Sequence, residues 1–188
     1  MLTLILGGAR SGKSRVARER AAGSGHIFHS QVSHGRICYI ATARPGDDTE
    51  MQARIARHRA DRPADWQTVE APLALAEAVE EASRQSAVVL VDCLTVWLSN
   101  LMFENRQAPA AETEAAALAE IDRMAAASRS AGRQVILVSN SNEVGWATVP
   151  DSPVARAFRD LQGIANQHAA QCADEVLLVV AGLAMKLK

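Results

Sequence analysis

The sequence has no apolar run long enough to cross a bilayer and no recognisable export signal. A membrane-spanning helix needs roughly 20 apolar residues, and no stretch of this chain approaches that length. The first six residues lack the basic start and the cleavage site of a signal peptide. We therefore expect no membrane span and a cytoplasmic location.

The sequence also lacks a basic excess and a cysteine framework. Its formal net charge is -1 at pH 7, whereas nucleic acids and anionic membranes bind strongly basic surfaces, so neither is expected as a partner. The three cysteines, Cys38, Cys93 and Cys172, are odd in number and widely spaced. This pattern favours neither disulfides nor a CxxC zinc site, and we interpret all three as core or near-core residues.

No Pro-, Gly- or Ser-rich run is long enough to act as a linker, which predicts a single domain over residues 1–188. Residues 22–36 resemble a surface loop. This loop contains His26, His29 and His34, but they lack the spacing of metal ligands and have no accompanying acid or thiol. Solvated loop histidines are the simpler interpretation.

Short apolar runs alternate with helical patterns along the chain, which is typical of parallel strands joined by crossover helices. The runs at 88–91 and 135–138 are apolar without alternation, as in strands buried on both faces. The predicted fold class is α/β, a P-loop NTPase-type (RecA-like), mostly parallel sheet with helices on both faces. In such a fold, ligands are expected at the C-terminal ends of the strands. The expected strands are 2–6, 36–41, 87–92, 133–139 and 175–181, and the expected helices are 13–21, 48–60, 73–84, 94–104, 111–131 and 152–172. In the last helix, apolar residues recur at steps of three and four, which predicts a stripe that faces the sheet. These residues are Val154, Phe158, Leu161, Ala165, Ala169 and Cys172.

The most specific local motif lies between the first strand and the first helix. It matches G-x-x-x-x-G-K-[ST], a loop whose backbone N–H groups hold phosphates at a helix N-terminus. Lys13 would reach the outer phosphates, and Ser14 would ligate Mg²⁺. The candidate phosphate-binding residues are Gly7, Gly8, Ala9, Arg10, Ser11, Gly12, Lys13 and Ser14.

Two further features point to phosphoryl chemistry. Asp92 ends an apolar strand and could hold the Mg²⁺ shell from across the site, although many strands end in an acid. Arg54, His58 and Arg62 are spaced by four residues, so a helix would present a histidine between two guanidinium groups. Cationic neighbours disfavour imidazolium and leave a ring nitrogen free to attack phosphorus. From spacing alone, a solvated basic helix face with an incidental histidine is the favoured interpretation.

Segments spread over nearly the whole chain resemble one family, the bifunctional adenosylcobinamide kinase and adenosylcobinamide-phosphate guanylyltransferase family. They are residues 7–14, 39–43, 48–66, 91–101, 142–145, 149–150, 156, 158–160, 163, 166–167, 181–183 and 186. The resemblance implies cobalamin biosynthesis: ATP or GTP phosphorylates adenosylcobinamide, and GMP from GTP then passes through a covalent histidine intermediate to adenosylcobinamide phosphate. The product is adenosylcobinamide-GDP.

The same resemblance identifies His58 as the histidine that carries GMP and implies a homo-oligomer, similar to a trimer. It extends the nucleotide contacts to Ala41, Thr42, Ala43, Arg59, Ala60, Asp61, Arg62, Glu70 and Asp92. Glu70 without the resemblance is equally well an exposed strand end. Residues 139–143 and Ala147-Thr148 depart from the family pattern, which leaves the conformation of that loop open.

Two alternatives differ in testable ways. A single-activity P-loop small-molecule kinase would use the loop and Asp92 but leave His58 without a task. A non-enzymatic GTP-binding switch would carry an Asn-Lys-x-Asp motif, and the sequence contains no Asn-Lys pair.

Overall fold

The computed structural model describes residues 1–23, 36–44, 49–60, 62–141 and 149–188, without the side chains of Glu50, Met51 and Arg54. Within these ranges the strands are β1 (Leu2–Gly7), β2 (Ile37–Ala41), β3 (Gln67–Glu70), β4 (Val88–Asp92), β5 (Gln134–Asn140), β6 (Glu175–Val180) and β7 (Leu183–Lys186). The helices are α1 (Lys13–Ala21), α2 (Thr49–Ala60), α3 (Leu75–Gln85), α4 (Leu94–Glu104), α5 (Ala110–Ser130) and α6 (Pro153–Cys172).

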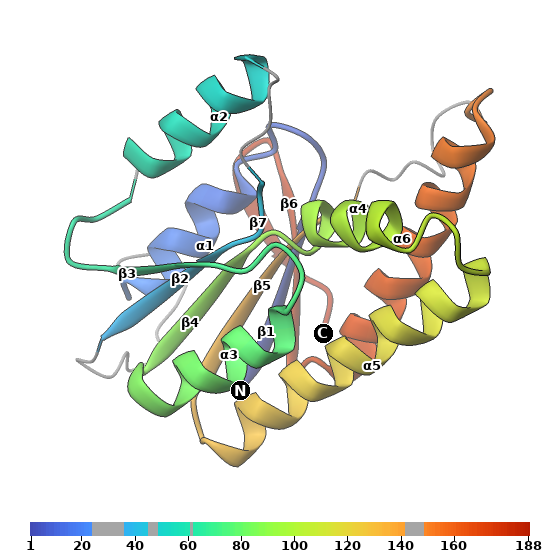
Figure 1. Ribbon diagram of the computed structural model, residues 1–188. Coiled ribbons are helices and arrows are strands. Elements are labelled where there is room, and N and C mark those ends of the chain that lie inside the picture. Colours follow the sequence, from blue (N-terminus) through green and yellow to red (C-terminus); the bar gives the residue numbers. More distant parts are fainter. Residues whose placement is uncertain (24–35, 45–48, 61, 142–148) are drawn as a thin grey trace.

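The described strands form one twisted sheet in the order β3-β2-β4-β5-β1-β6-β7 (Figure 1). All neighbours are parallel except β6 and β7, which form an antiparallel hairpin. β5 lies between β1, which leads into the glycine-rich loop, and β4, which ends in Asp92. This is the arrangement expected of a RecA-like P-loop fold, and it brings several strand ends to one edge of the sheet.

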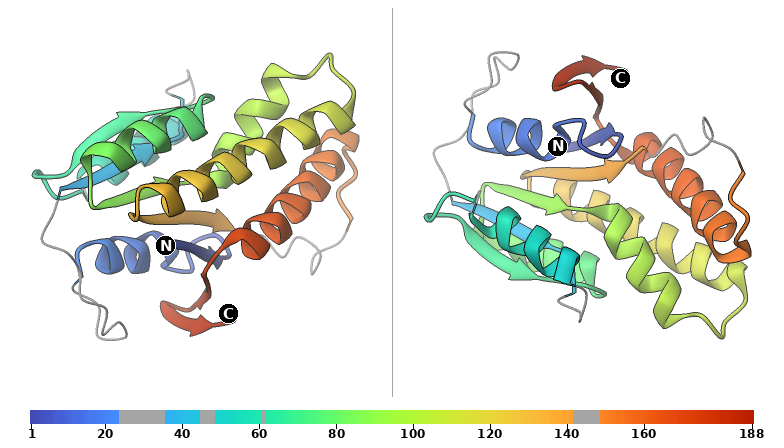
Figure 2. Two further views of the ribbon diagram at one scale, coloured as in Figure 1. Left: turned by 90° about the horizontal axis from the view of Figure 1, so that it is seen from below. Right: turned by 90° about the horizontal axis from the view of Figure 1, so that it is seen from above.

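Helices cover both faces of the sheet, as predicted (Figure 2). On one face, α3, α4, α5 and α6 bury a core that includes Leu4, Trp97 and Ile121. On the other, Val16 and Ala17 of α1 pack in a second core on the opposite strand faces. Because both faces are covered, the central strands are apolar at nearly every position.

All five predicted strands and all six predicted helices are confirmed within two residues at each end. The search for apolar runs did not predict β3 and β7. Both are four-residue edge strands whose side chains are mostly exposed, so neither contains an apolar run. The prediction that the helix over 152–172 buries one continuous stripe is wrong at its start. Val154 is 66% exposed, while Leu161 and Ala169 are buried.

Among the residues described, none of the helices is both long and apolar enough to cross a membrane. Cys38 and Cys93 are buried, as expected, whereas Cys172 is partly exposed at the end of α6. The predicted loop histidines at 26, 29 and 34, and the atypical 142–148 segment, lie outside the described residues.

Candidate active site

A cavity of about 140 Å³ lies where four parallel strands end beneath α2. Ala41, Glu70, Asp92 and Asn140 are the last residues of β2, β3, β4 and β5, and all four line it. Its other lining residues are Lys13, Ser14, Tyr39, Ala43, Ile55, His58, Arg59, Arg62, Cys93 and Val96. The predicted position of the site, at the carboxyl ends of the strands, therefore coincides with a cavity of the described structure.

The glycine-rich loop connects β1 to α1 through a tight turn. Ser11 N–H donates to the Gly8 carbonyl at 3.2 Å, and Gly12 adopts a left-handed conformation with φ of 93°. Gly7 packs so closely that an added Cβ would lie 2.4 Å from Ser11 Oγ and 2.7 Å from the Val179 carbonyl oxygen. At the end of the loop, Lys13 Nζ donates to the Gly8 carbonyl at 3.2 Å. The loop is thus closed around its own lysine at the start of a helix, where anions are favoured.

The turn between β6 and β7 supports this loop from outside. Gly182 N–H donates to the Ser11 carbonyl at 2.8 Å, and Arg15 Nη2 donates to the Gly182 carbonyl at 3.0 Å. A Cβ on Gly12 would lie 3.2 Å from the Gly182 Cα, so the two backbones approach closely at glycine positions. This gives a structural role to the 181–183 segment, to which the sequence assigned none.

Asp92 is held by a tyrosine that the sequence analysis did not include in the site. The Tyr39 hydroxyl donates to Asp92 Oδ2 at 2.8 Å, and the Arg62 guanidinium lies 3.9 Å from the centre of the Tyr39 ring. Burial, followed by the Asp92 charge, raises the pKa of Tyr39 well above its usual range. The tyrosine therefore stays protonated and acts as a fixed donor to the carboxylate.

His58 projects from α2 into the same cavity. Its Nδ1 lies 3.9 Å from Asp92 Oδ2, and its side chain is 34% exposed. Next to it, Arg59 forms an ion pair with Glu70, which joins the end of α2 to β3. The sequence analysis considered only cationic neighbours of His58, whereas the folded chain adds a carboxylate on its Nδ1 side. That carboxylate favours a ring orientation in which Nε2 is the free nitrogen.

Thr42 does not line the cavity, although it follows the end of β2. Its side chain is fully buried, with Oγ1 donating to the Cys93 carbonyl at 2.8 Å and accepting from the Cys93 N–H at 2.9 Å. Asn100 Nδ2 donates to the Thr42 carbonyl at 2.8 Å and to the Pro72 carbonyl at 3.0 Å. Burial, followed by the Asp92 charge, raises the pKa of the Cys93 thiol to about 11. Thr42 thus fixes the strand ends instead of lining the cavity.

The structure brings nine of the predicted residues together around the cavity: Lys13, Ser14, Ala41, Ala43, His58, Arg59, Arg62, Glu70 and Asp92. Gly7, Gly8, Ala9, Arg10, Ser11 and Gly12 form the loop but do not line the cavity, and Ala60 is exposed at the end of α2. Asp61 and the side chain of Arg54 lie outside the described residues.

Asn140 is the clearest residue that sequence reasoning missed. It lines the cavity, and its Oδ1 is buried without a hydrogen-bond partner among the residues that the structure describes. Buried polar atoms are nearly always paired, so this oxygen is a candidate ligand contact. Its position as the last residue of a central strand was the signal that could have identified it.

Ser14 and Asp92 offer a hydroxyl and a carboxylate to the same cavity. These hard oxygen donors fit Mg²⁺, which binds one or two protein carboxylates together with phosphate oxygens. The site therefore contains, within one small cavity, a phosphate-type loop, suitable ligands for Mg²⁺ and a histidine.

The sheet order and the glycine-rich loop define an α/β fold of the P-loop type. Comparison with known proteins identifies one family within this class. Residues 3–187 match the family model described as cobinamide kinase / cobinamide phosphate guanyltransferase. The chain therefore belongs to this family.

Three relatives are similar over the full length of the chain. It is 44% identical over 191 residues to the bifunctional adenosylcobalamin biosynthesis protein CobP of Pseudomonas aeruginosa, covering 100% of this chain and 98% of the relative. It is 40% identical over 198 residues to the bifunctional adenosylcobalamin biosynthesis protein CobU of Escherichia coli, covering 100% of both chains. The CobU protein of Salmonella typhimurium is also 40% identical, over 197 residues and 100% of both chains. The sequence resemblance is confirmed at the level of the family.

Proposed function

We propose that this chain phosphorylates adenosylcobinamide with ATP or GTP and then transfers GMP from GTP, through a covalent GMP-histidine intermediate on His58, to adenosylcobinamide phosphate. The observation that carries this proposal is that His58 faces the cavity lined by Lys13 and Ser14 of the glycine-rich loop. A phosphate loop alone accounts for a kinase. A histidine in the same cavity accounts for the second transfer.

In the kinase step, the aminopropanol hydroxyl of adenosylcobinamide attacks the γ-phosphorus. The bond to the bridging oxygen breaks, the nucleoside diphosphate leaves, and the hydroxyl proton is released. The loop N–H groups and Lys13 bind the phosphate oxygens on which negative charge accumulates. Lys13 exchanges its contact with the Gly8 carbonyl for these oxygens when the nucleotide binds.

In the guanylyl step, Nε2 of His58 attacks the α-phosphorus of GTP and pyrophosphate leaves. Asp92, 3.9 Å from Nδ1, stabilises the positive charge that the ring gains on forming the N–P bond. A phosphate oxygen of adenosylcobinamide phosphate then attacks the same phosphorus, the N–P bond breaks, and the imidazole is restored. Arg59 and Arg62, both lining the cavity, would bind the phosphate chain.

Mg²⁺ bound by Ser14 and Asp92 would neutralise phosphate charge in both steps. Tyr39 supports this role from the protein side, because its hydroxyl fixes one Asp92 oxygen and leaves the carboxylate in a defined orientation. Asn140 adds a buried amide oxygen that a substrate donor would satisfy. Nucleotide contacts at Ala41, Ala43, Ala60, Asp61 and Glu70, and at the loop residues from Gly7 to Gly12, are part of the same proposal.

The cavity of about 140 Å³ is smaller than the roughly 300 Å³ at the lower end of small-molecule sites. A whole nucleoside triphosphate would therefore extend out of this cavity unless α2 moves away from the strand ends. In Figure 1, α2 stands apart from the helices that cover the two faces of the sheet, and Arg59–Glu70 is an exposed ion pair. Such pairs contribute little free energy, so this contact opposes the movement only weakly.

The function is tested by supplying adenosylcobinamide and Mg²⁺ with ATP first and GTP second, and identifying products by mass spectrometry. We expect adenosylcobinamide phosphate after ATP and adenosylcobinamide-GDP after GTP. His58→Ala should retain the first product and lose the second, while Arg57→Ala, an exposed change on the same helix, should form both. Formation of the first product alone by the unchanged chain would support the single-activity kinase. If the unchanged chain forms neither product, both the bifunctional enzyme and the single-activity kinase are contradicted.

One further proposal, on the oligomeric state, rests on the family. A homo-oligomer, with a trimer as the expected form, is testable by light scattering. A cytoplasmic location and a single domain over residues 1–188 remain predictions.

A further inference from the structure

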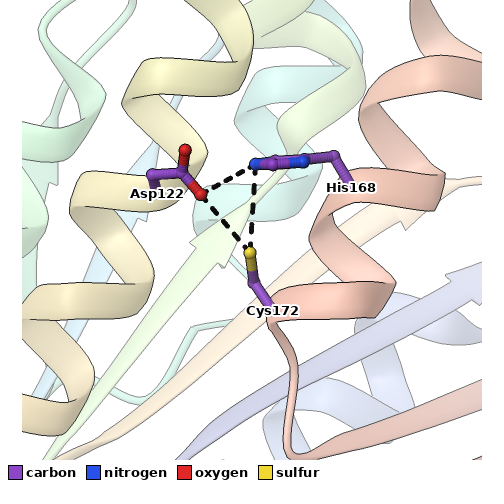
Figure 3. Close-up of side chains that lie close together, drawn as sticks. All are labelled: Asp122, His168 and Cys172. Carbon is purple, nitrogen blue, oxygen red and sulfur yellow. Dashed lines mark hydrogen bonds and ion pairs between the residues drawn. The ribbon is translucent and has the colours of Figure 1, made fainter.

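Three side chains with metal-binding chemistry meet between α5 and α6, as Figure 3 shows. His168 Nε2 lies 2.8 Å from Asp122 Oδ1, Cys172 Sγ lies 3.5 Å from the same oxygen, and Cys172 Sγ lies 3.9 Å from His168 Nε2. Each side chain directs one donor atom to a common point. The cluster therefore presents an oxygen, a nitrogen and a sulfur as three corners of one small triangle.

The size of this triangle fits a tetrahedral ion. Zn²⁺ binds sulfur at about 2.3 Å and nitrogen or oxygen at about 2.0 to 2.2 Å, which separates neighbouring ligand atoms by roughly 3.3 to 3.6 Å. The three separations of 2.8, 3.5 and 3.9 Å bracket that range. Small side-chain rotations suffice to equalise them, because Asp122 is 59% exposed and His168 is 25% exposed.

The geometry differs from that of a nucleophile-base-acid relay. In a relay, the carboxylate binds one ring nitrogen and the nucleophile binds the other. Here Asp122 and Cys172 both contact His168 Nε2. The contacts therefore do not follow the order of a relay, and each of the three residues has one donor atom in the cluster to offer to a shared ion.

Local structure explains why the donors meet. His168 and Cys172 are four residues apart in the last turn of α6, so they lie on one helix face, and α5 supplies Asp122 from the packed neighbour. The C-terminal end of a helix carries partial negative charge and favours cations. Lys188 already donates to the Ala173 carbonyl at this end, at 2.6 Å.

This cluster is separate from the candidate active site. α6 ends at Cys172, immediately before β6 begins at Glu175, so the cluster lies at the amino edge of the parallel strands. The cavity lies at their carboxyl edge. An ion bound here would contact neither the glycine-rich loop nor His58.

We propose that Asp122, His168 and Cys172 bind a divalent transition-metal ion of the Zn²⁺ type, with water as the fourth ligand, and that this ion ties α5 to α6. A thiolate and an imidazole select Zn²⁺ over Mg²⁺, which prefers oxygen ligands alone. Binding releases the Cys172 proton to solvent, since the thiol that donates to Asp122 becomes a thiolate on the metal. The proton of the His168–Asp122 hydrogen bond leaves Nε2 as well and returns to the ring at Nδ1 through solvent, so that a neutral imidazole binds the ion through Nε2.

Co²⁺ added to the metal-free protein, without corrinoid, tests the site by absorption spectroscopy. We expect a thiolate-to-cobalt charge-transfer band in the near ultraviolet and strong visible bands of four-coordinate Co²⁺, both lost when one equivalent of Zn²⁺ is added. Cys172→Ser should remove the charge-transfer band and weaken Zn²⁺ binding by more than about 100-fold. His58→Ala, in the cavity at the other edge of the sheet, should leave the band unchanged.

A second readout separates metal binding from a folding defect. Zn²⁺ should raise the Tm of the unchanged protein but not that of Cys172→Ser or His168→Ala, provided circular dichroism shows that both variants are folded. The proposal is overturned if Co²⁺ gives only the weak bands of oxygen ligation, or if the charge-transfer band survives in Cys172→Ser.

Discussion

Nδ1 of His58 lies 3.9 Å from Oδ2 of Asp92, the same oxygen that accepts the Tyr39 hydroxyl. One carboxylate thus links α2 to β2 and to the end of β4. It lies on the Nδ1 side of His58, and it accepts a hydrogen bond from a tyrosine inside the sheet. The geometry of the proposed nucleophile is therefore set partly by a residue that does not touch the reacting phosphorus.

Tyr39 should titrate well above the usual tyrosine pKa of about 10. Its pKa is raised by burial, the Asp92 charge and the hydrogen bond to Asp92. It is the only tyrosine in the chain, so the tyrosinate absorbance of the folded protein reports on this residue alone. We expect no tyrosinate signal at pH 10 in the folded protein and a normal titration in denaturant. A midpoint near 10 in the folded state would contradict the buried hydrogen bond.

The raised pKa of Tyr39 also makes the folded protein less stable at high pH. Above about pH 10 the unfolded chain releases the Tyr39 proton while the folded chain retains it, so the free energy of unfolding falls as pH rises through this window. Below pH 10 both states are protonated and Tyr39 contributes no pH dependence. Tyr39→Phe should flatten this part of the curve, measured by denaturant unfolding from pH 9 upward.

Gly7→Ala should destabilise the protein by about 1 to 3 kcal/mol, because the new Cβ would meet the Val179 carbonyl, a backbone atom that moves only with β6. Gly8→Ala is the matched control, since no atom lies within 4 Å of its added Cβ. We expect its free energy of unfolding to change by less than about 0.5 kcal/mol. A loss in Gly7→Ala as small as that in Gly8→Ala would contradict the predicted clash with the Val179 carbonyl.

Glu175→Gln should cost about 1 to 3 kcal/mol of stability, because it replaces a charged partner of the buried Arg20 guanidinium with a neutral amide. Arg20 is 4% exposed and Glu175 is 16% exposed, and burial lowers the pKa of Arg20 while Glu175 opposes this effect. Glu81→Gln breaks an exposed ion pair with Arg84 and should cost less than about 1 kcal/mol. Denaturant unfolding at pH 7 compares the two. Similar small losses would contradict a dominant role of Glu175 in holding the Arg20 charge.

The sequence predicted those parts of the fold and of the site that a local pattern defines. Apolar runs identified the central strands, and the loop ending in Lys13 and Ser14 was predicted together with its place at the strand ends. Contacts between distant segments could not be predicted. Tyr39 lies within a strand and resembles an ordinary core residue until β4 brings Asp92 beside it.

The cluster of Asp122, His168 and Cys172 could not be predicted from the sequence either, because its residues come from two helices. Cys172 belonged to an apolar stripe, and its partner Asp122 comes from another helix, 50 residues away. The exposed edge strands β3 and β7 lack apolar runs, so only pairing with a neighbouring strand identifies them. In each case, the deciding contact is tertiary.

The most direct test of the account is the covalent intermediate. GTP labelled at the α-phosphate should leave label on the protein in the presence of Mg²⁺, and the bond should be acid-labile and base-stable, as expected of a phosphoramidate. GTP labelled at the γ-phosphate should leave none, because that label departs with pyrophosphate. His58→Ala should abolish labelling, while Arg57→Ala should retain it. Absence of label with GTP demonstrably bound, or label that persists in His58→Ala, would contradict transfer through His58.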